Sequence, residues 1–259
     1  MYHESRSIII ALALKYKGDW NQIYRSCRRG EDIEEEYFQM IEKMPFHATT
    51  IIDADYPQFL KNVRHPPIVL FYYGDLSIID DYYKNIAVVG SRDCSEYGQQ
   101  MTRQIAGDLA KRGYVIASGL ARGIDGIAHR AAIESGGKTV AILGCGIDYC
   151  YPSDNQNLYD IIKKDHLLIS EYPFDTLPSP SNFPFRNRII AGIGKTVLVT
   201  EAAQKSGTLI TATLASMMNA DVMCVPHPAG INSECNQLIK NGAILVESAD
   251  DVIEQISDF

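Results

Sequence analysis

Short segments made up almost entirely of apolar residues recur along the last two thirds of the chain. They are mostly β-branched or aliphatic and do not alternate with polar residues, which is typical of strands buried on both faces. Helical stretches separate most of them. Strands that alternate with helices predict the α/β class, here a Rossmann-like, doubly wound and mostly parallel sheet with right-handed crossovers. We expect these strands at residues 86–89, 114–117, 139–143, 167–169, 196–199, 222–225 and 243–246.

The pattern is different in the first third of the chain. An apolar run at residues 8–14 is too short to cross a bilayer, and no small-residue cleavage site follows it, so it predicts a buried helix. Ile33, Tyr37 and Ile41 share one helical face. We therefore expect a small helical extension at residues 1–45, a Pro- and Tyr-rich lead-in at 46–84 with an edge strand over residues 68–73, and a Rossmann-like domain at 85–259.

Composition changes this picture little, but the distribution of charge matters. Hydrophobic residues make up 46% of the chain, an ordinary value for a globular protein. Six cysteines occur without a CxxC pair, which favours reduced thiols in the cytoplasm and no metal site. The net charge of -8 is uneven: residues 84–205 carry 14 Lys and Arg against 12 Asp and Glu, whereas the remainder carries 10 against 20. The nearly neutral middle permits a local phosphate site.

Glycine-rich loops follow four of the predicted strands. They are 90–92, 118–125, 144–148 and 200–208, the last of which opens an apolar helix. In open α/β sheets, ligands bind beyond the carboxyl ends of the strands. Glycine lets the backbone approach an anion closely, and helix amino-terminal amides favour phosphate. The loops therefore predict a phosphate pocket, to which forked guanidinium donors would be added by Arg92, Arg122, Arg186 and Arg188.

Fingerprints of cofactor or catalytic sites do not accompany these loops. The GxGxxG pattern is missing after the first strand of the alternating region, and no Walker A lysine, GxSxG or HExxH occurs. We expect no cofactor, no metal and no catalytic residue. Structural interpretations of single residues stay open: Arg122 may pair with Asp125, Asp148 may cap a helix, and His129 and Cys145 are expected to be packing residues.

Several ordered motifs resemble the DNA-processing protein A family (DprA, also called Smf), over residues 50–247. The strongest are 86–92 (IAVVGSR), 118–129 (SGLARGIDGIAH), 170–173 (SEYP), 182–192 (NFPFRNRIIAG) and 201–212 (EAAQKSGTLITA). The lead-in from Asp55 to Pro67 and the segment from Cys235 to Ala243 are similar to the same family.

The resemblance implies a non-enzymatic protein. Members bind single-stranded DNA, bring in the recombinase RecA during natural transformation and commonly form homodimers through the Rossmann-like domain. No membrane partner is expected. By similarity, the residues that hold DNA phosphate or shape the pocket are Gly90, Ser91, Arg92, Gly119, Arg122, Gly123, Gly144, Gly146, Asp148, Asn155, Arg186, Asn187, Arg188, Glu201, Ser206, Gly207 and Thr208.

Three departures from the family pattern accompany the match. Many relatives carry a basic residue after the Tyr-Pro of the third loop, where this chain has Ser153 and Asp154. The sequence ends at Phe259, so we expect no carboxy-terminal winged helix. The amino-terminal helices match the family only loosely.

Two other functions stay open. Rossmann-like phosphoribohydrolases that process nucleotides also place glycine-rich loops and a glutamate at strand ends, and Glu201 would then serve as the general base. A sensor of small nucleotides would use the same pocket without binding polymer.

Overall fold

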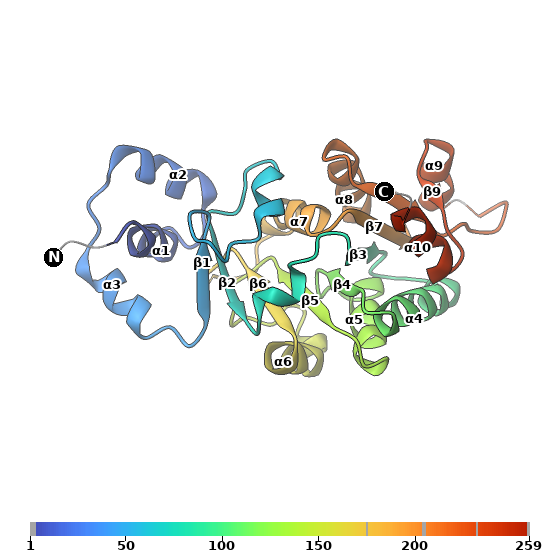
Figure 1. Ribbon diagram of the computed structural model, residues 1–259, viewed down its shortest axis with the longest axis horizontal. Helices are drawn as coiled ribbons and strands as arrows, with labels where there is room; N and C mark the ends of the chain where they lie inside the picture. Colours follow the sequence, from blue (N-terminus) through green and yellow to red (C-terminus); the bar gives the residue numbers. More distant parts are fainter. Residues whose placement is uncertain (1–3, 175, 204–205, 232, 258–259) are drawn as a thin grey trace.

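The computed structural model describes residues 4–174, 176–203, 206–231 and 233–257. Within them a single nine-stranded sheet runs along the molecule, with helices on both sides (Figure 1). The strand order is β1-β2-β6-β5-β4-β3-β7-β8-β9. The strands are β1 (His47–Thr50), β2 (Val69–Tyr73), β3 (Asn85–Gly90), β4 (Val115–Ser118), β5 (Thr139–Leu143), β6 (Leu167–Ser170), β7 (Thr196–Glu201), β8 (Asp221–Cys224) and β9 (Ile244–Leu245).

The seven strands from β6 to β9 in this order are paired in parallel, which confirms the predicted Rossmann-like α/β fold. The strand expected at residues 68–73 forms as β2, but it is not at the edge. It pairs antiparallel with β6 on one side and with β1 on the other, so β1 is the edge strand. The lead-in is therefore part of the main sheet; the domain boundaries after residues 45 and 84 stay predictions.

The chain reverses direction across the sheet between β3 and β7. From β3 it moves outward through β4, β5 and β6, and then it returns to the other side of β3 as β7. Ile86 to Val89 of β3 lie beside Thr196 to Val199 of β7. The loops that leave these two neighbouring strands diverge to opposite sides, which opens a crevice at their carboxyl ends.

Helices cover the two faces of the sheet. They are α1 (Ser5–Lys15), α2 (Trp20–Arg29), α3 (Glu35–Glu42), α4 (Glu96–Lys111), α5 (Ile124–Glu134), α6 (Gln156–Asp165), α7 (Asn182–Gly192), α8 (Gly207–Met217), α9 (Glu234–Lys240) and α10 (Ala249–Ser257), with short 3-10 helices η1 (Gln58–Asn62), η2 (Leu76–Ile79) and η3 (Ser153–Asn155). Among the described residues, no helix has both the length and the apolar character needed to cross a membrane.

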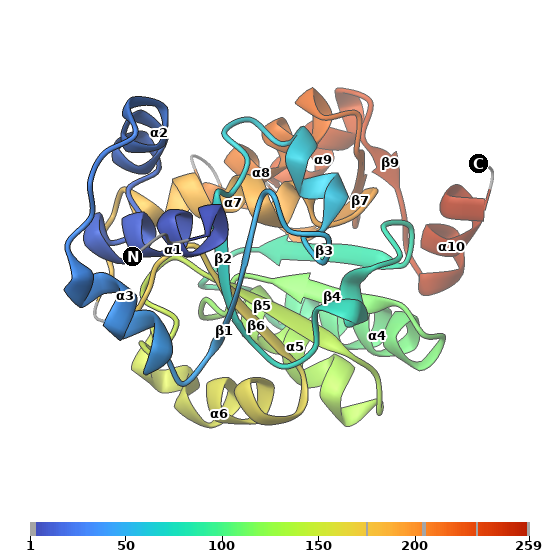
Figure 2. The ribbon, with the colours of Figure 1, turned by 60° about the vertical axis from the view of Figure 1, so that its left-hand side comes forward.

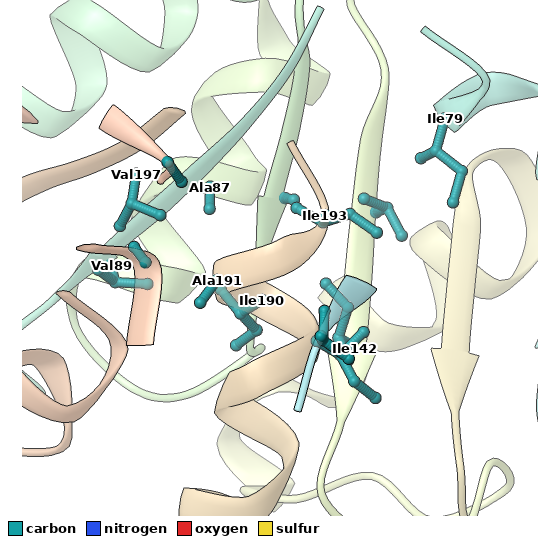
Figure 3. Close-up of a cluster of buried hydrophobic side chains, with 14 of the residues drawn as sticks. Ile79, Ala87, Val89, Ile142, Ile190, Ala191, Ile193 and Val197 are labelled. Carbon is teal, nitrogen blue, oxygen red and sulfur yellow. The ribbon is translucent and has the colours of Figure 1, made fainter. Parts of the chain in front are cut away.

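Alternate residues of β3 enter different parts of the core. Ala87 and Val89 pack with α7 residues such as Ile190, in the cluster drawn in Figure 3. Ile86 and Val88 pack on the opposite face with residues of α4, α5 and α10. Burial on both faces explains why residues 86–89 of this strand are all apolar.

The predicted helical amino-terminal part is confirmed. Its apolar run forms α1, and Ile10 and Leu14 share a buried cluster with Phe71 of β2 and Leu143 of β5. Trp20 of α2 donates its indole N–H to the Pro66 carbonyl at 2.7 Å. These contacts seat the helices against the β1 end of the sheet (Figure 2).

Candidate functional site

Two adjoining cavities open at the carboxyl ends of β3 and β7. The first, of about 620 Å³, lies between the loop after β3, α7 and the start of α8. The second, of about 670 Å³, lies between the loop after β3, the loop after β4 and residues 149–153. The two form one continuous groove, because both are lined by Arg92, Asp93, Ala121, Tyr151, Phe183 and Arg186.

The loop after β3 is fixed by its backbone. The Ser91 N–H donates to the Glu201 carbonyl at 2.9 Å, and the Ser91 carbonyl accepts from the Ile124 N–H at 3.1 Å. A Cβ on Gly90 would lie 2.5 Å from Ile124, so only glycine fits there. The exposed Arg92 side chain lines both cavities and has no ion pair or hydrogen bond within the described part of the chain. Arg92 is therefore available for an anion.

Gly123 supports this loop and does not line either cavity. Its φ is +72°, and a Cβ would lie 2.3 Å from the Ser91 carbonyl oxygen. The glycine lets the loop after β4 lie directly against the loop after β3. Gly119 lines the second cavity, and a Cβ added to it would likewise collide with the side chains of Arg186 and Asp125.

Arg186 and Asp125 are both buried beside Gly119 in the floor of the groove, where each affects the pKa of the other. Arg186 donates to the Gly119 carbonyl at 3.1 Å and also to the Ile142 carbonyl, and Asp125 accepts from the Gly119 N–H at 3.1 Å. Burial raises the pKa of Asp125, against the opposing effect of Arg186. Its bonds to the Gly119 and Ile142 carbonyls show that Arg186 holds the loop after β4 in place.

Arg188 lies outside both cavities. It makes a two-pronged ion pair with buried Glu171 of the β6 loop, at 2.6 and 2.5 Å, and donates through Nε to the His65 carbonyl at 2.8 Å. These bonds anchor α7 to the segments that follow β6 and precede β2. The structure thus places Arg188 among the residues that position α7.

Glu201 also faces away from the groove. Its carboxylate accepts from the Ser95 N–H at 3.1 Å and from the Ser95 hydroxyl at 2.5 Å, at the first turn of α4. An acidic group at a helix amino terminus is stabilised by the helix dipole. The carboxylate caps α4, and Glu201 lines neither cavity.

The start of α8 forms one wall of the first cavity. Ser206, Gly207 and Thr208 line it together with Asn187, whose side-chain amide donates to the Gly207 carbonyl at 3.3 Å. The Ser206 hydroxyl is buried and has no hydrogen-bond partner within the described residues. Free amides of the first helical turn and an unpaired hydroxyl are the donors that a phosphate uses.

The remaining predicted residues, Gly144, Gly146, Asp148 and Asn155, line neither cavity and instead contact the segments around the groove. Gly144 leaves room for Phe183, since a Cβ would lie 2.7 Å from its ring. Gly146 donates its N–H to the Thr176 carbonyl at 2.7 Å. Asn155 donates to the Leu120 and Ala121 carbonyls at 3.0 and 3.1 Å. Asp148 lies outside the cavities and binds Tyr73 and Lys163, at 2.7 and 2.8 Å.

Arg122 does not pair with Asp125. It lines the second cavity and forms an ion pair with Asp154 at 2.7 Å, in which both side chains are more than half exposed. Such a pair contributes only about 0–1 kcal/mol. The acidic residue that distinguishes the third loop therefore partly neutralises a cation of the groove.

Two residues considered for chemistry are packing residues, as expected. The buried His129 shares a 2.6 Å hydrogen bond with Thr139, and burial lowers the pKa of His129 to about 3. Burial raises the pKa of the Cys145 thiol to about 12. In the part of the chain that the structure describes, no group of three or more His, Cys, Asp and Glu side chains is placed to hold a metal.

Sequence reasoning missed the aromatic lining of the groove. Tyr149, Tyr151 and Phe183 line the second cavity, and the rings of Tyr151 and Phe183 lie 5.3 Å apart. Tyr149 and Tyr151 are 41% and 44% exposed. Tyrosines beside a glycine-rich loop with arginines nearby are the signal in the sequence that could have predicted a nucleic-acid surface here.

The fold and the groove define a Rossmann-like protein with a glycine-lined groove and the exposed Arg92 at its topological switch point. A family model described as DNA recombination-mediator protein A matches residues 47–257. The chain belongs to this family, which confirms the resemblance seen in its motifs.

Individual relatives support this family assignment. The chain is 40% identical over 237 residues to the DNA processing protein DprA of Streptococcus pneumoniae, covering 88% of this chain and 83% of that protein. It is 40% identical over 208 residues to Protein Smf of Synechocystis, covering 79% of this chain but only 52%, about half, of that relative's length.

Two solved structures share the whole architecture. The X-ray structure of DprA from Streptococcus pneumoniae has a TM-score of 0.80 and 35% identity, covering 96% of this chain and 92% of that one. A structure of DprA from Helicobacter pylori, described for its mode of single-stranded DNA binding, has a TM-score of 0.75 and 28% identity, covering 83% and 98% of the two chains.

Proposed function

We propose that the chain binds single-stranded DNA by its phosphate backbone in the groove at the β3–β7 switch point. The observation that carries this proposal is Arg92, an exposed guanidinium without a partner in the described chain, set between a glycine loop and the start of α8. Charged groups aimed at a backbone give affinity without sequence preference and with strong salt dependence.

A polymer fits the groove better than a single nucleotide does. The two cavities adjoin and share Arg92, so one phosphate on that residue would have a sugar and base on either side. Tyr151 and Phe183 line both cavities and offer ring faces to the bases. Stacking on aromatic side chains is tolerant of sequence, as a protein that handles arbitrary strands needs.

Membership of this family supports a more specific function than DNA binding alone. We propose that the chain acts without catalysis, as a cytoplasmic mediator that helps load RecA on incoming single strands during natural transformation. A homodimer would use the outer edge of β9, which pairs only with β8 within the described sheet and leaves Leu245 48% exposed. An unpaired edge strand is a ready surface for a second chain.

The hydrolase alternative is disfavoured by one observation: the Glu201 carboxylate is held at the α4 amino terminus and does not line the groove. A general base must reach the proton that it removes. Incubation with nucleoside monophosphates tests it. Release of free base that is lost in Glu201→Gln would establish the enzyme and overturn the mediator function.

The proposed function itself is tested by a salt titration. Fluorescence anisotropy with a labelled oligothymidine and with a duplex of equal length is expected to show preference for the single strand and an affinity that falls steeply with salt. Equal affinity for both, or none for either, would contradict it.

A further inference from the structure

The second amino-terminal helix, α2, has a basic outer face. Ile23 and Ser26 of this helix are buried, whereas Arg25, Arg28 and Arg29 are exposed. These three arginines are spaced three and four residues apart, so they share one side of the helix. Within the described residues none of them forms an ion pair or a side-chain hydrogen bond.

Acidic residues close to α2 in sequence do not neutralise this face. Glu31 is paired with Lys15 at 2.9 Å and accepts from the Tyr16 hydroxyl at 2.6 Å. Hydrogen bonds from Ser26, Tyr16 and Lys15, in that order of effect, lower the pKa of Glu31 to about 2. Asp19 caps α2 by accepting from the Gln22 N–H at 3.0 Å. Adjacent like charges on a helix are slightly destabilising. Arg28 and Arg29 lie in the last turn of α2, where positive charge suits the helix dipole, but none of the three arginines has an acidic partner among the described residues.

Aromatic contacts join this face to the first turn of α7, the helix that forms one wall of the groove. Tyr24, 44% exposed, stacks on Trp20 with centroids 5.0 Å apart. Trp20 meets the edge of His65 at 4.7 Å, and His65 lies 6.2 Å from Phe185 of α7. Two residues before Phe185 in the same helix is Phe183, whose ring lines both cavities. Helices α2, α7 and α8 lie on the same side of the sheet in both views (Figures 1 and 2).

We propose that α2 is a second contact surface for the single strand that leaves the groove. Phosphates of the strand would lie on Arg25, Arg28 and Arg29, and a base would stack on the open face of Tyr24. This inference rests on the proposed function, since it names a further surface for the same ligand. It assigns a role to the helical extension, which presents its basic charge where a strand passing α7 would meet it.

Oligonucleotides of two lengths separate the two surfaces. An oligothymidine of about six nucleotides would fill the groove alone, and one of about twenty would also reach α2. In a variant with Arg25→Gln, Arg28→Gln and Arg29→Gln, we expect unchanged affinity for the short strand. Affinity for the long strand should fall about tenfold at low salt, and the slope of log affinity against log salt should flatten by about 2. Glutamine is a good helix former, so α2 should persist.

A matched control removes three positive charges elsewhere. Lys84, Lys164 and Lys240 are exposed and lie on other elements, and their replacement by Gln changes the net charge equally. The inference is overturned if the arginine and lysine variants weaken long-strand binding alike, or if neither does. Loss of short-strand binding in Arg92→Glu tests the groove separately. Thus the α2 surface can fail while the proposed function stands.

A second measurement needs no change to the arginines. Cys27 of α2 is exposed, so a fluorophore on it in a Cys94→Ser, Cys150→Ser background reports contact with this helix. We expect the long strand, but not the short one, to change its emission. An equal response to both strands, or none to the long strand, would overturn the inference.

Discussion

Arg122, which lines the second cavity, forms an ion pair with Asp154 of the third loop, with their charged atoms 2.7 Å apart. Both side chains are mostly exposed, so the ion pair is weak and opens easily. Its position matters more than its strength. The carboxylate lies where a DNA phosphate would approach, and it competes with that phosphate for the same guanidinium.

Removing this carboxylate should strengthen DNA binding. In Asp154→Asn, we expect affinity for single-stranded oligothymidine to rise about threefold to tenfold at low salt, because Arg122 is released and a like charge is lost. Fluorescence anisotropy measures the change. The matched control is Asp160→Asn, which removes an exposed charge from α6. Equal effects of the two variants would show that only net charge matters and that Asp154 has no local role.

The Glu171–Arg188 pair should govern stability. In Glu171→Gln, a buried guanidinium loses its charged partner, and we expect the free energy of unfolding to fall by about 3–5 kcal/mol. Chemical denaturation measures this loss. At temperatures where the variant is folded, its DNA affinity should change less than twofold, because Arg188 lies outside both cavities. A large loss of affinity in the folded variant would instead place Arg188 in the interface.

His129 should make the fold sensitive to acid. Its pKa is lowered from 6.5 to about 3 by burial, so the unfolded chain binds a proton in this interval and the folded chain does not. The contribution of neutral His129 to the free energy of unfolding is fully present above pH 6.5 and is lost as the pH falls towards 3. Between pH 6.5 and 5 the loss is about 2 kcal/mol, at about 1.4 kcal/mol per pH unit.

Urea denaturation of the unmutated chain and of His129→Gln at several pH values tests this. The variant should be less stable at pH 7, because the bond to Thr139 is altered, but its stability should fall less steeply below pH 6.5. Parallel pH profiles would show that His129 is not the group responsible.

Much of the fold could be predicted because its signals are local. Strands buried on both faces, such as β3 and β7, have an uninterrupted apolar middle at residues 86–89 and 197–199, and helices separate most of these strands. The parallel, doubly wound class followed from this alternation. The place of β2 inside the sheet could not be predicted, because its partner β1 is a four-residue strand, His47–Thr50, with no clear apolar pattern of its own.

The glycine loops could be located from the sequence, but the partners of charged residues could not. Arg186 and Arg188 are two positions apart in one helix, yet the first lies beneath the groove and the second binds Glu171, which belongs to a distant segment. Glu201 follows a strand that ends at the groove, but its side chain turns to Ser95. Such pairings depend on three-dimensional packing, which a linear motif does not encode.

The central claim is that the exposed guanidinium of Arg92 binds the phosphate backbone of single-stranded DNA, and its substitution tests this most directly. Arg92 has no partner in the described chain, so Arg92→Glu should leave the melting temperature nearly unchanged. Anisotropy with oligothymidine should show a loss of affinity of at least about a hundredfold at low salt, whereas Arg92→Lys, which keeps the charge but loses the fork, should lose about threefold to tenfold. Unchanged affinity in a folded Arg92→Glu variant would contradict the account.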